Sequence, residues 1–240
     1  MQHKIVKYQD SDLTCHGYMV YDENQSTPQP TILLVHAFDG ITDHIKEYAD
    51  KVAQAGYTVF AADMFGKGRT GKNLDECMGF IKPLFGDRAA LKNRIFAAFN
   101  AAKEQSEIDE KKIAAMGFCF GGMSVLDLAR AGADVKGVAS LHGLFVAPEV
   151  LPEATMTAKV LILHGYDDPQ VQPDQLPMIA KELNDKNVDW QFVYFSHTKH
   201  AYTEPRAAEI GPPEFGREYN KVSAERAWQY CQDFFKEVLS

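Results

Sequence analysis

The stretch MGFCFGGMS, residues 116–124, decides the fold. It places Cys119 between two aromatic residues and follows it with two glycines and a helix-forming run. Glycines at 117, 121 and 122 remove Cβ atoms where the end of a strand and the start of a helix would crowd each other. The pattern predicts a sharp strand-to-helix turn that projects its central side chain above the sheet, an arrangement typical of a nucleophile.

The start of a helix also carries partial positive charge and free N–H groups, which favour a thiolate at Cys119. The alternative interpretation is a small buried hydrophobe, as most cysteines are, but the glycine pattern favours a nucleophile. The other cysteines have no such surroundings, and their spacing fits neither a disulfide framework nor a zinc site. We expect three structural cysteines: Cys15, Cys77 and Cys231.

Composition and charge limit the class of protein. The 240 residues are 45% hydrophobic and 24% charged, which predicts one soluble globular domain over residues 1–240. The net charge of −8 argues against nucleic acid and anionic membranes as partners, because phosphate binding needs clustered cations. No apolar run approaches the roughly 18 residues that span a bilayer, and the first residues lack a signal-peptide core. We expect a cytoplasmic protein, monomeric or homodimeric.

Short β-branched runs alternate with longer helical patterns along the chain. This alternation predicts an α/β fold with a mostly parallel sheet and helices on both faces. Strands are expected at residues 31–38, 57–62, 112–118, 135–142, 159–164 and 190–195. Helices are expected at residues 42–56, 88–105, 122–131, 173–184 and 223–239.

Two parts of the chain do not follow this alternation of strands and helices. The runs at residues 5–8 and 15–21 predict an antiparallel pair at one edge of the sheet. Residues 64–86 are rich in glycine and aromatic side chains. We interpret them as an elaborated loop or helix segment near a pocket, and not as a second domain.

A candidate acid follows the strand expected at residues 159–164, in the sequence GYDDPQV. Open α/β sheets place their site residues at the carboxyl ends of strands. Asp168 lies three residues before Val171, so the valine can anchor the loop while the carboxylate points inward. Asp167 is the competing choice, and its alternative role is a turn residue or helix cap.

A candidate base follows the strand expected at residues 190–195, in the sequence SHTKHAYTEP. His200 is favoured because Ala201 and Tyr202 follow it and could hold the imidazole over the turn. His197 lies closer to the strand, where it would satisfy only local hydrogen bonds. The other strand-end histidines are interpreted as turn or core residues with paired nitrogens and not as metal ligands: His36, His142 and His164.

The motifs GFCFGG, HGYDDPQV and KHAYT, in this order, resemble those of the dienelactone hydrolase family, and HAFDG and AADMFGKG strengthen the match. The resemblance covers residues 5–239. It implies an α/β-hydrolase fold, no cofactor, and a triad of Cys119 as nucleophile, Asp168 as acid and His200 as base. It also implies an oxyanion hole formed by the backbone N–H groups of Phe38 and Phe120.

Two positions depart from the family pattern. Dienelactone hydrolases carry a glutamate just before the first oxyanion residue, where this chain has Ala37. They also carry an arginine four residues after the histidine, where this chain has Glu204, and the nearby Arg206 does not align with it. These differences predict a substrate other than the dienelactone itself.

The expected reaction is hydrolysis of a small activated ester or lactone through a covalent intermediate on Cys119. The apolar residues expected to line the pocket beside Phe38 and Phe120 favour aryl-type substrates; they are Phe65, Phe80, Phe145 and Tyr202. Phosphotriesters are an alternative substrate, and a redox-sensing or ligand-binding thiol protein is an alternative class. A serine hydrolase using Ser124 or Ser140 is disfavoured, because neither lies at the centre of the turn.

Overall fold

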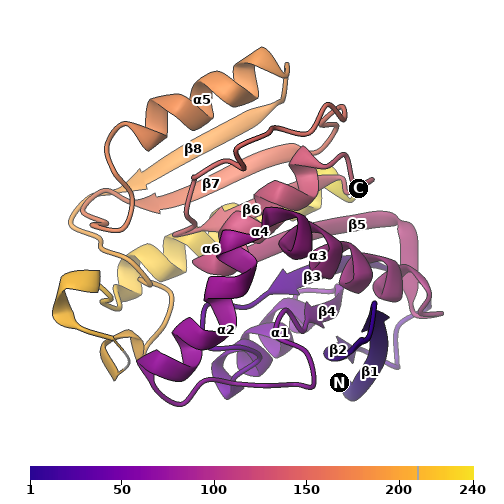
Figure 1. Ribbon diagram of the computed structural model, residues 1–240. Helices are drawn as coiled ribbons and strands as arrows, with labels where there is room; N and C mark the ends of the chain where they lie inside the picture. The colour runs from indigo at the N-terminus through magenta and orange to yellow at the C-terminus, as the bar shows by residue number, and fades with distance from the viewer. Residues whose placement is uncertain (210) are drawn as a thin grey trace.

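One sheet of eight strands organises the computed structural model, which describes residues 1–209 and 211–240. The strands are β1 (Gln2–Asp10), β2 (Leu13–Tyr21), β3 (Gln29–Val35), β4 (Thr58–Ala62), β5 (Ile108–Phe118), β6 (Gly137–Leu141), β7 (Lys159–Gly165) and β8 (Trp190–Phe195). Their order is β1-β2-β4-β3-β5-β6-β7-β8, with β1 and β8 at the two edges (Figure 1). Strands β3 to β8 are parallel, and the β1–β2 pair forms the expected antiparallel edge.

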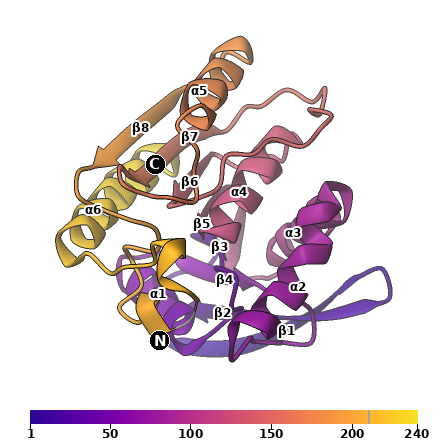
Figure 2. The ribbon, with the colours of Figure 1, turned by 60° about the vertical axis from the view of Figure 1, so that its left-hand side comes forward.

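Helices cover both faces of this sheet. They are α1 (Asp43–Gln54), α2 (Leu74–Gly86), α3 (Arg88–Lys103), α4 (Phe120–Arg130), α5 (Gln175–Asp185) and α6 (Lys221–Val238). Helices α1 and α6 pack on one face, and α3, α4 and α5 bury their apolar sides on the other (Figure 2). Each face therefore has its own hydrophobic core, and the central strands β3, β4 and β6 are buried on both sides. This is the α/β-hydrolase fold.

The central strands explain why the site lies where it does. β3 and β5 are neighbours in the middle of the sheet, and both end at the same edge with fully buried residues. β3 ends at Val35, three residues earlier than the sequence predicted, because the chain from His36 leaves the sheet to form a loop. Ligand sites of open α/β sheets lie outside these carboxyl ends.

The segment of residues 64–86 contains a loop followed by helix α2. The carboxylate of Asp63 accepts backbone N–H groups of Phe65, Gly66 and Gly68, which organises the start of the loop. The Asn73 side chain then caps α2 by accepting the N–H of Glu76 at 3.0 Å. The helix was not among those predicted individually, because Gly79 and Pro83 interrupt its sequence.

No helix within residues 1–209 and 211–240 is long and apolar enough to cross a membrane.

Candidate active site

Cys119 occupies the sharp turn between β5 and α4. Its backbone φ of 53° lies in the left-handed region that non-glycine residues rarely adopt, so the turn is strained. A Cβ atom on Gly117 would overlap the Gly121 carbonyl, and one on Gly121 would overlap the carbonyl of Val35. A Cβ atom on Gly122 would lie 2.7 Å from the backbone of Gly143. The prediction that these glycines allow close backbone packing is confirmed.

Asp168 and His200 meet beside this turn. Nδ1 of His200 lies 2.7 Å from Oδ2 of Asp168, and both side chains are buried. The other carboxylate oxygen of Asp168 accepts the N–H of Gln170 at 2.8 Å, while Val171 is anchored in the core. The competing residues Asp167 and His197 are exposed. The structure therefore brings together the aspartate and histidine that the sequence favoured.

The electrostatic surroundings of His200 favour its protonated form. Burial alone would lower the pKa of this imidazole, but the negative charge of a Cys119 thiolate and the hydrogen bond to Asp168 raise the pKa to about 9. Nε2 of His200 makes no hydrogen bond of standard geometry with any residue in 1–209 or 211–240. Catalytic hydrogen bonds are often long before substrate binds, and Nε2 is thus the nitrogen available for the sulfur or a substrate atom.

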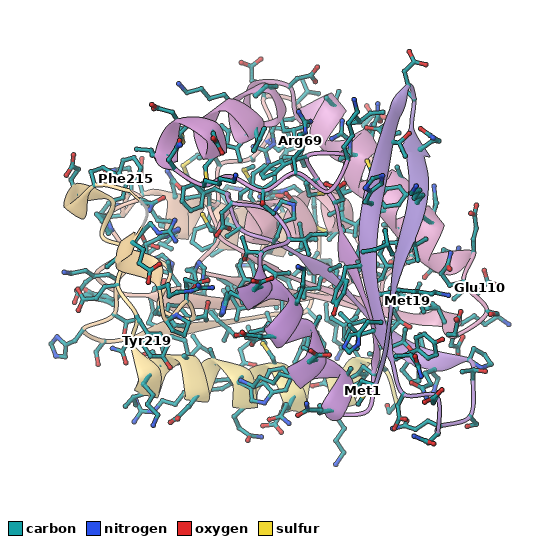
Figure 3. The ribbon with its side chains drawn as sticks, turned by 90° about the horizontal axis from the view of Figure 1, so that it is seen from below. Met1, Met19, Arg69, Glu110, Phe215 and Tyr219 are labelled. Atoms are coloured by element: carbon teal, nitrogen blue, oxygen red, sulfur yellow. The ribbon has the colours of Figure 1, made fainter. Side chains whose placement is uncertain are left out.

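A cavity of about 330 Å³ opens onto Cys119 and His200. Its remaining lining consists of Phe38, Met78, Ile81, Lys82, Phe85, Gly86, Phe120, Leu144, Gln170, Phe215 and Arg217. Most of these side chains are apolar, and they come from α2, from loops after the central strands, and from the segment before α6. Phe215 lies on this last segment (Figure 3). The arrangement can hold a small, largely apolar molecule against a thiol.

Comparisons with known proteins identify the family of this chain. The model of the dienelactone hydrolase family matches residues 15–239. The chain belongs to the dienelactone hydrolase family. As a member of this family, the protein is a hydrolase that acts on ester bonds.

Individual proteins and a solved structure are also similar to this chain. A putative carboxymethylenebutenolidase of Aquifex aeolicus is 26% identical, with 98% of this chain and 99% of that protein covered. An uncharacterized protein of Caenorhabditis elegans is 32% identical over 62% of this chain and 95% of its own length. A solved structure of a dienelactone-hydrolase-like promiscuous phosphotriesterase from metagenomic libraries has a TM-score of 0.94 and 34% identity, covering 100% of this chain and 99% of that one.

Four residues expected in the pocket do not line the 330 Å³ cavity at Cys119 in this dienelactone hydrolase family member. Phe65 is buried against His36, and Phe80 packs on Phe65 from the side of α2 that faces away from the cavity. Phe145 is buried against the ring of His164. Tyr202 is fully buried and donates its hydroxyl hydrogen to the carbonyl of Leu163 at 3.1 Å. Phe65 also packs on Phe120, with 6.1 Å between ring centroids, whereas Phe38 and Phe120 line the cavity itself.

Helix α2 supplies lining residues that the sequence analysis missed. Met78, Ile81, Lys82 and Phe85 follow the spacing i, i+3, i+4, i+7, which places them on one face of a helix. Phe80 lies off this stripe and consequently points elsewhere. The helical periodicity was present in the sequence and could have identified these residues.

Arg217 is a second residue that the sequence analysis missed. Its backbone bridges to that of His200, and its guanidinium lies 4.2 Å from the centroid of the Phe38 ring. Burial raises the pKa of Asp39 and of Glu204, and the charge of Arg217 opposes both rises. Neither carboxylate lies within ion-pair distance of this guanidinium in the described part of the chain. No sequence pattern marked Arg217, because a tertiary contact alone brings it to the cavity.

The two positions that depart from the family pattern border a smaller cavity of about 20 Å³, which also contacts Cys119 and His200. Ala37 lines this space and brings no carboxylate to the thiol. Glu204 also lines it and pairs with His44 at 3.2 Å. Arg206 lines neither of these two cavities.

The sequence analysis expected paired ring nitrogens in the other strand-end histidines. This expectation is wrong for His142 and His164. Nε2 of His142 lies 2.8 Å from Oγ1 of Thr203, but Nδ1 of His142 and Nδ1 of His164 have no hydrogen-bond partner within residues 1–209 and 211–240. Burial lowers the pKa of both rings, that of His164 to about 4, which keeps them neutral. In the same residues, no group of three or more His, Cys, Asp or Glu side chains is arranged to hold a metal ion.

The three other cysteines and the two alternative serines do not line the cavity at Cys119. Burial raises the pKa of Cys15 and Cys77 to about 11 and that of Cys231 to about 12. Ser124 donates to the carbonyl of Phe120 within α4, and Ser140 is fully buried. Cys119 is half-buried and is the cysteine that faces the cavity in the described structure.

Proposed function

We propose that the protein hydrolyses small activated carboxylic esters or lactones through a covalent thioester on Cys119. The observation that carries the proposal is the 2.7 Å contact between His200 and Asp168 at the cavity that contains Cys119. In this proposal His200 is the proton shuttle, and Asp168 holds its imidazole in the Nδ1–H tautomer.

The first half of the reaction forms the thioester. The Cys119 thiolate attacks the substrate carbonyl carbon, and the electrons of the C=O bond move to the oxygen. Collapse of this tetrahedral intermediate breaks the bond to the leaving oxygen, which receives the proton from Nε2 of His200. The alcohol or phenol then departs and leaves an acyl group on sulfur.

The second half releases the acid. Neutral His200 takes a proton from water while the water oxygen attacks the thioester carbon. Collapse of this second intermediate breaks the C–S bond and restores the thiolate and the imidazolium, and the carboxylic acid leaves. In both halves, the oxyanion would be bound by the backbone N–H groups of Phe38 and Phe120.

The surroundings of these two N–H groups support their role as an oxyanion hole. Phe120 is the first residue of α4, and the first N–H groups of a helix have no partner within the helix. No hydrogen bond within residues 1–209 and 211–240 engages the N–H of Phe38 or of Phe120. Both residues line the cavity together with Cys119. Such donors each contribute roughly 3–4 kcal/mol to transition-state stabilisation.

The cavity and the nucleophile together suggest the substrate class. A thiolate is a good leaving group, so the intermediate reverts unless the substrate's own leaving group is acidic. The volume of about 330 Å³ and the mainly apolar lining suit aryl esters and lactones. Lys82 and Arg217 add positive charge at this cavity, a property that composition did not predict.

Phosphotriesters are a second candidate substrate. The supporting observation is the likeness to a solved promiscuous phosphotriesterase at 34% identity over the whole chain. Attack by Cys119 on phosphorus would also create an oxyanion and expel an acidic phenol. The slow step would be hydrolysis of the phosphorus–sulfur bond.

Turnover of p-nitrophenyl acetate tests the proposed function. We expect Cys119→Ala and His200→Ala to lower kcat/KM by at least about 10³-fold, because the nucleophile and its base act as one unit. Cys231→Ala removes a buried thiol and is the matched control, which retains activity. Iodoacetamide should alkylate Cys119 selectively, as located by mass spectrometry. Near-wild-type turnover in Cys119→Ala would remove this mechanism and favour a thiol with no catalytic role.

Paraoxon tests the second substrate class in the same variants. Release of p-nitrophenol in one burst, with a phosphorylated Cys119 found by mass spectrometry, supports attack on phosphorus followed by slow release. Release that is independent of Cys119 would contradict this candidate and leave the ester reaction unaffected.

A further inference from the structure

His36 makes two hydrogen bonds at the start of the loop that carries Phe38. Its Nδ1 lies 2.6 Å from the carbonyl oxygen of Ala37, and its Nε2 lies 3.2 Å from the backbone nitrogen of Met64. The ring is fully buried and packs edge-on against Phe65 with 4.6 Å between centroids. The imidazole is thus held on three sides.

The two partners determine the tautomer of His36. The Met64 nitrogen is a backbone N–H donor, so Nε2 must be the unprotonated acceptor. Nδ1 therefore carries the hydrogen and donates it to the Ala37 carbonyl. Burial also lowers the pKa of His36, which is consistent with a neutral ring.

The bond to Ala37 restrains the peptide group that joins Ala37 to Phe38. In a planar trans peptide, the C=O and the following N–H point in opposite directions. Restraining the Ala37 carbonyl toward His36 consequently directs the Phe38 N–H away from it. We propose that His36 is a positioning residue that locks this peptide plane and aims the Phe38 N–H at the reacting oxygen. The inference rests on the proposed function, in which Phe38 supplies one oxyanion donor.

Two further observations fit a positioning role. His36 lines neither cavity at Cys119, so it acts through the Ala37–Phe38 peptide and not on the substrate. The loop also touches the other half of the oxyanion hole, because a Cβ atom on Gly121 would lie 2.5 Å from the His36 carbonyl oxygen. The backbone next to Phe120 is thereby packed against the start of the loop that leads to Phe38. This contact involves the carbonyl of His36 and not the Ala37–Phe38 peptide, so the orientation of that peptide depends on the separate hydrogen bond from His36 to Ala37.

Two amide substitutions separate the hydrogen bonds of His36. The side-chain amide of asparagine reaches the position of Nδ1 and can still donate to Ala37. The longer glutamine places its amide near Nε2, where it can accept from Met64 but does not reach Ala37. We expect His36→Gln to lower kcat for p-nitrophenyl acetate by about 100-fold with KM changed less than about threefold. His36→Asn should stay within about tenfold of the wild type.

Alkylation by iodoacetamide is the internal control, because this displacement uses the same thiolate and forms no oxyanion. We expect His36→Gln to be alkylated at the wild-type rate, with Cys119 as the site. Unchanged kcat in His36→Gln, or equal losses of turnover and alkylation, would overturn the inference. A larger loss of kcat in His36→Asn than in His36→Gln would overturn it too. Failure of the proposed function is distinguishable, since Cys119→Ala would then retain the wild-type turnover.

A measurement on the unaltered protein tests the inference if the variants do not fold. The nitrogen chemical shifts of the His36 ring, obtained by NMR, report which nitrogen carries the hydrogen. We expect the neutral Nδ1–H tautomer throughout the range from about pH 6 to 9, since both partners require it. An Nε2–H tautomer or an imidazolium would overturn the proposed peptide lock.

Discussion

Nδ1 of His200 lies 2.7 Å from Oδ2 of Asp168, although the two residues are 32 positions apart in the chain. The contact forms because β7 and β8 are parallel neighbours whose carboxyl ends lie at one edge of the sheet. Asp168 follows β7 and His200 follows β8, so the loops that carry them begin at neighbouring strand ends. The fold itself therefore sets up the proposed acid–base pair, before any substrate binds.

Replacing the carboxylate of Asp168 tests its orienting role. Asp168→Asn keeps the shape of the side chain but can present an N–H to Nδ1, which would favour the wrong tautomer of His200. We expect kcat for p-nitrophenyl acetate to fall about 10³–10⁴-fold. Asp167→Asn alters the exposed neighbour and should keep kcat within about twofold. A loss below tenfold in Asp168→Asn would contradict the role of this carboxylate.

The raised pKa of His200 predicts the alkaline limit of activity. A pKa raised to about 9 keeps the imidazolium present below that pH, and it is lost as the pH rises through about 9. We expect kcat/KM for esters with poor leaving groups to fall above about pH 9, because the imidazolium must protonate that group. p-Nitrophenyl esters need no such proton and should show a weaker fall. An alkaline limit near the ordinary histidine pKa of about 6.5 would contradict this.

The source of this pKa shift can be tested separately. Cys119→Ser replaces the thiolate with a neutral hydroxyl and removes the charge that raises the His200 pKa. We expect the pKa of His200 in this variant to lie well below about 9, as followed by NMR titration of the ring. An unchanged pKa would assign the shift to Asp168 alone.

The parts of the site that were predictable have local signatures. The glycines around Cys119 mark the turn because only they fit where two backbones touch, and strand ends mark Asp168 and His200 because the topology aligns them. Helix α2 was recoverable from its periodicity but was obscured by Gly79 and Pro83.

Other parts of the site depend on tertiary contacts that leave no local pattern. Arg217 reaches the cavity through its backbone bridge to His200, its stack on Phe38 and its hydrogen bond to Ala207. Whether an aromatic ring lines the cavity or supports it from behind depends on a side-chain direction that composition does not encode. Phe65 and Phe80 illustrate this limit, because both lie near the cavity and neither faces it.

Substitution of Gly121 tests the steric reason for the turn. A Cβ atom there would overlap the carbonyl group of Val35, so the backbone must move. We expect Gly121→Ala to lower the free energy of unfolding by about 3 kcal/mol, as measured with urea. Gly79→Ala is the matched control, because a Cβ atom at this exposed position of α2 meets nothing within 4 Å. It should raise the free energy of unfolding by about 0.5–1 kcal/mol. Equal effects of the two substitutions would contradict the packing argument.

Arg217 should determine how the cavity treats negatively charged substrates. Its Nε donates to the carbonyl of Ala207 at 3.1 Å, and its guanidinium stacks on the Phe38 ring at the cavity. The terminal N–H groups therefore remain available to a negatively charged substrate. We expect Arg217→Gln to lower kcat/KM for an anionic ester, p-nitrophenyl hemiglutarate, about tenfold relative to neutral p-nitrophenyl butyrate. This ratio corresponds to about 1.4 kcal/mol, the size of one charge-assisted hydrogen bond. Arg206→Gln removes an arginine outside the cavity and should leave the ratio unchanged. Equal losses on both esters in Arg217→Gln would show that the guanidinium supports the wall of the cavity and does not select for charge.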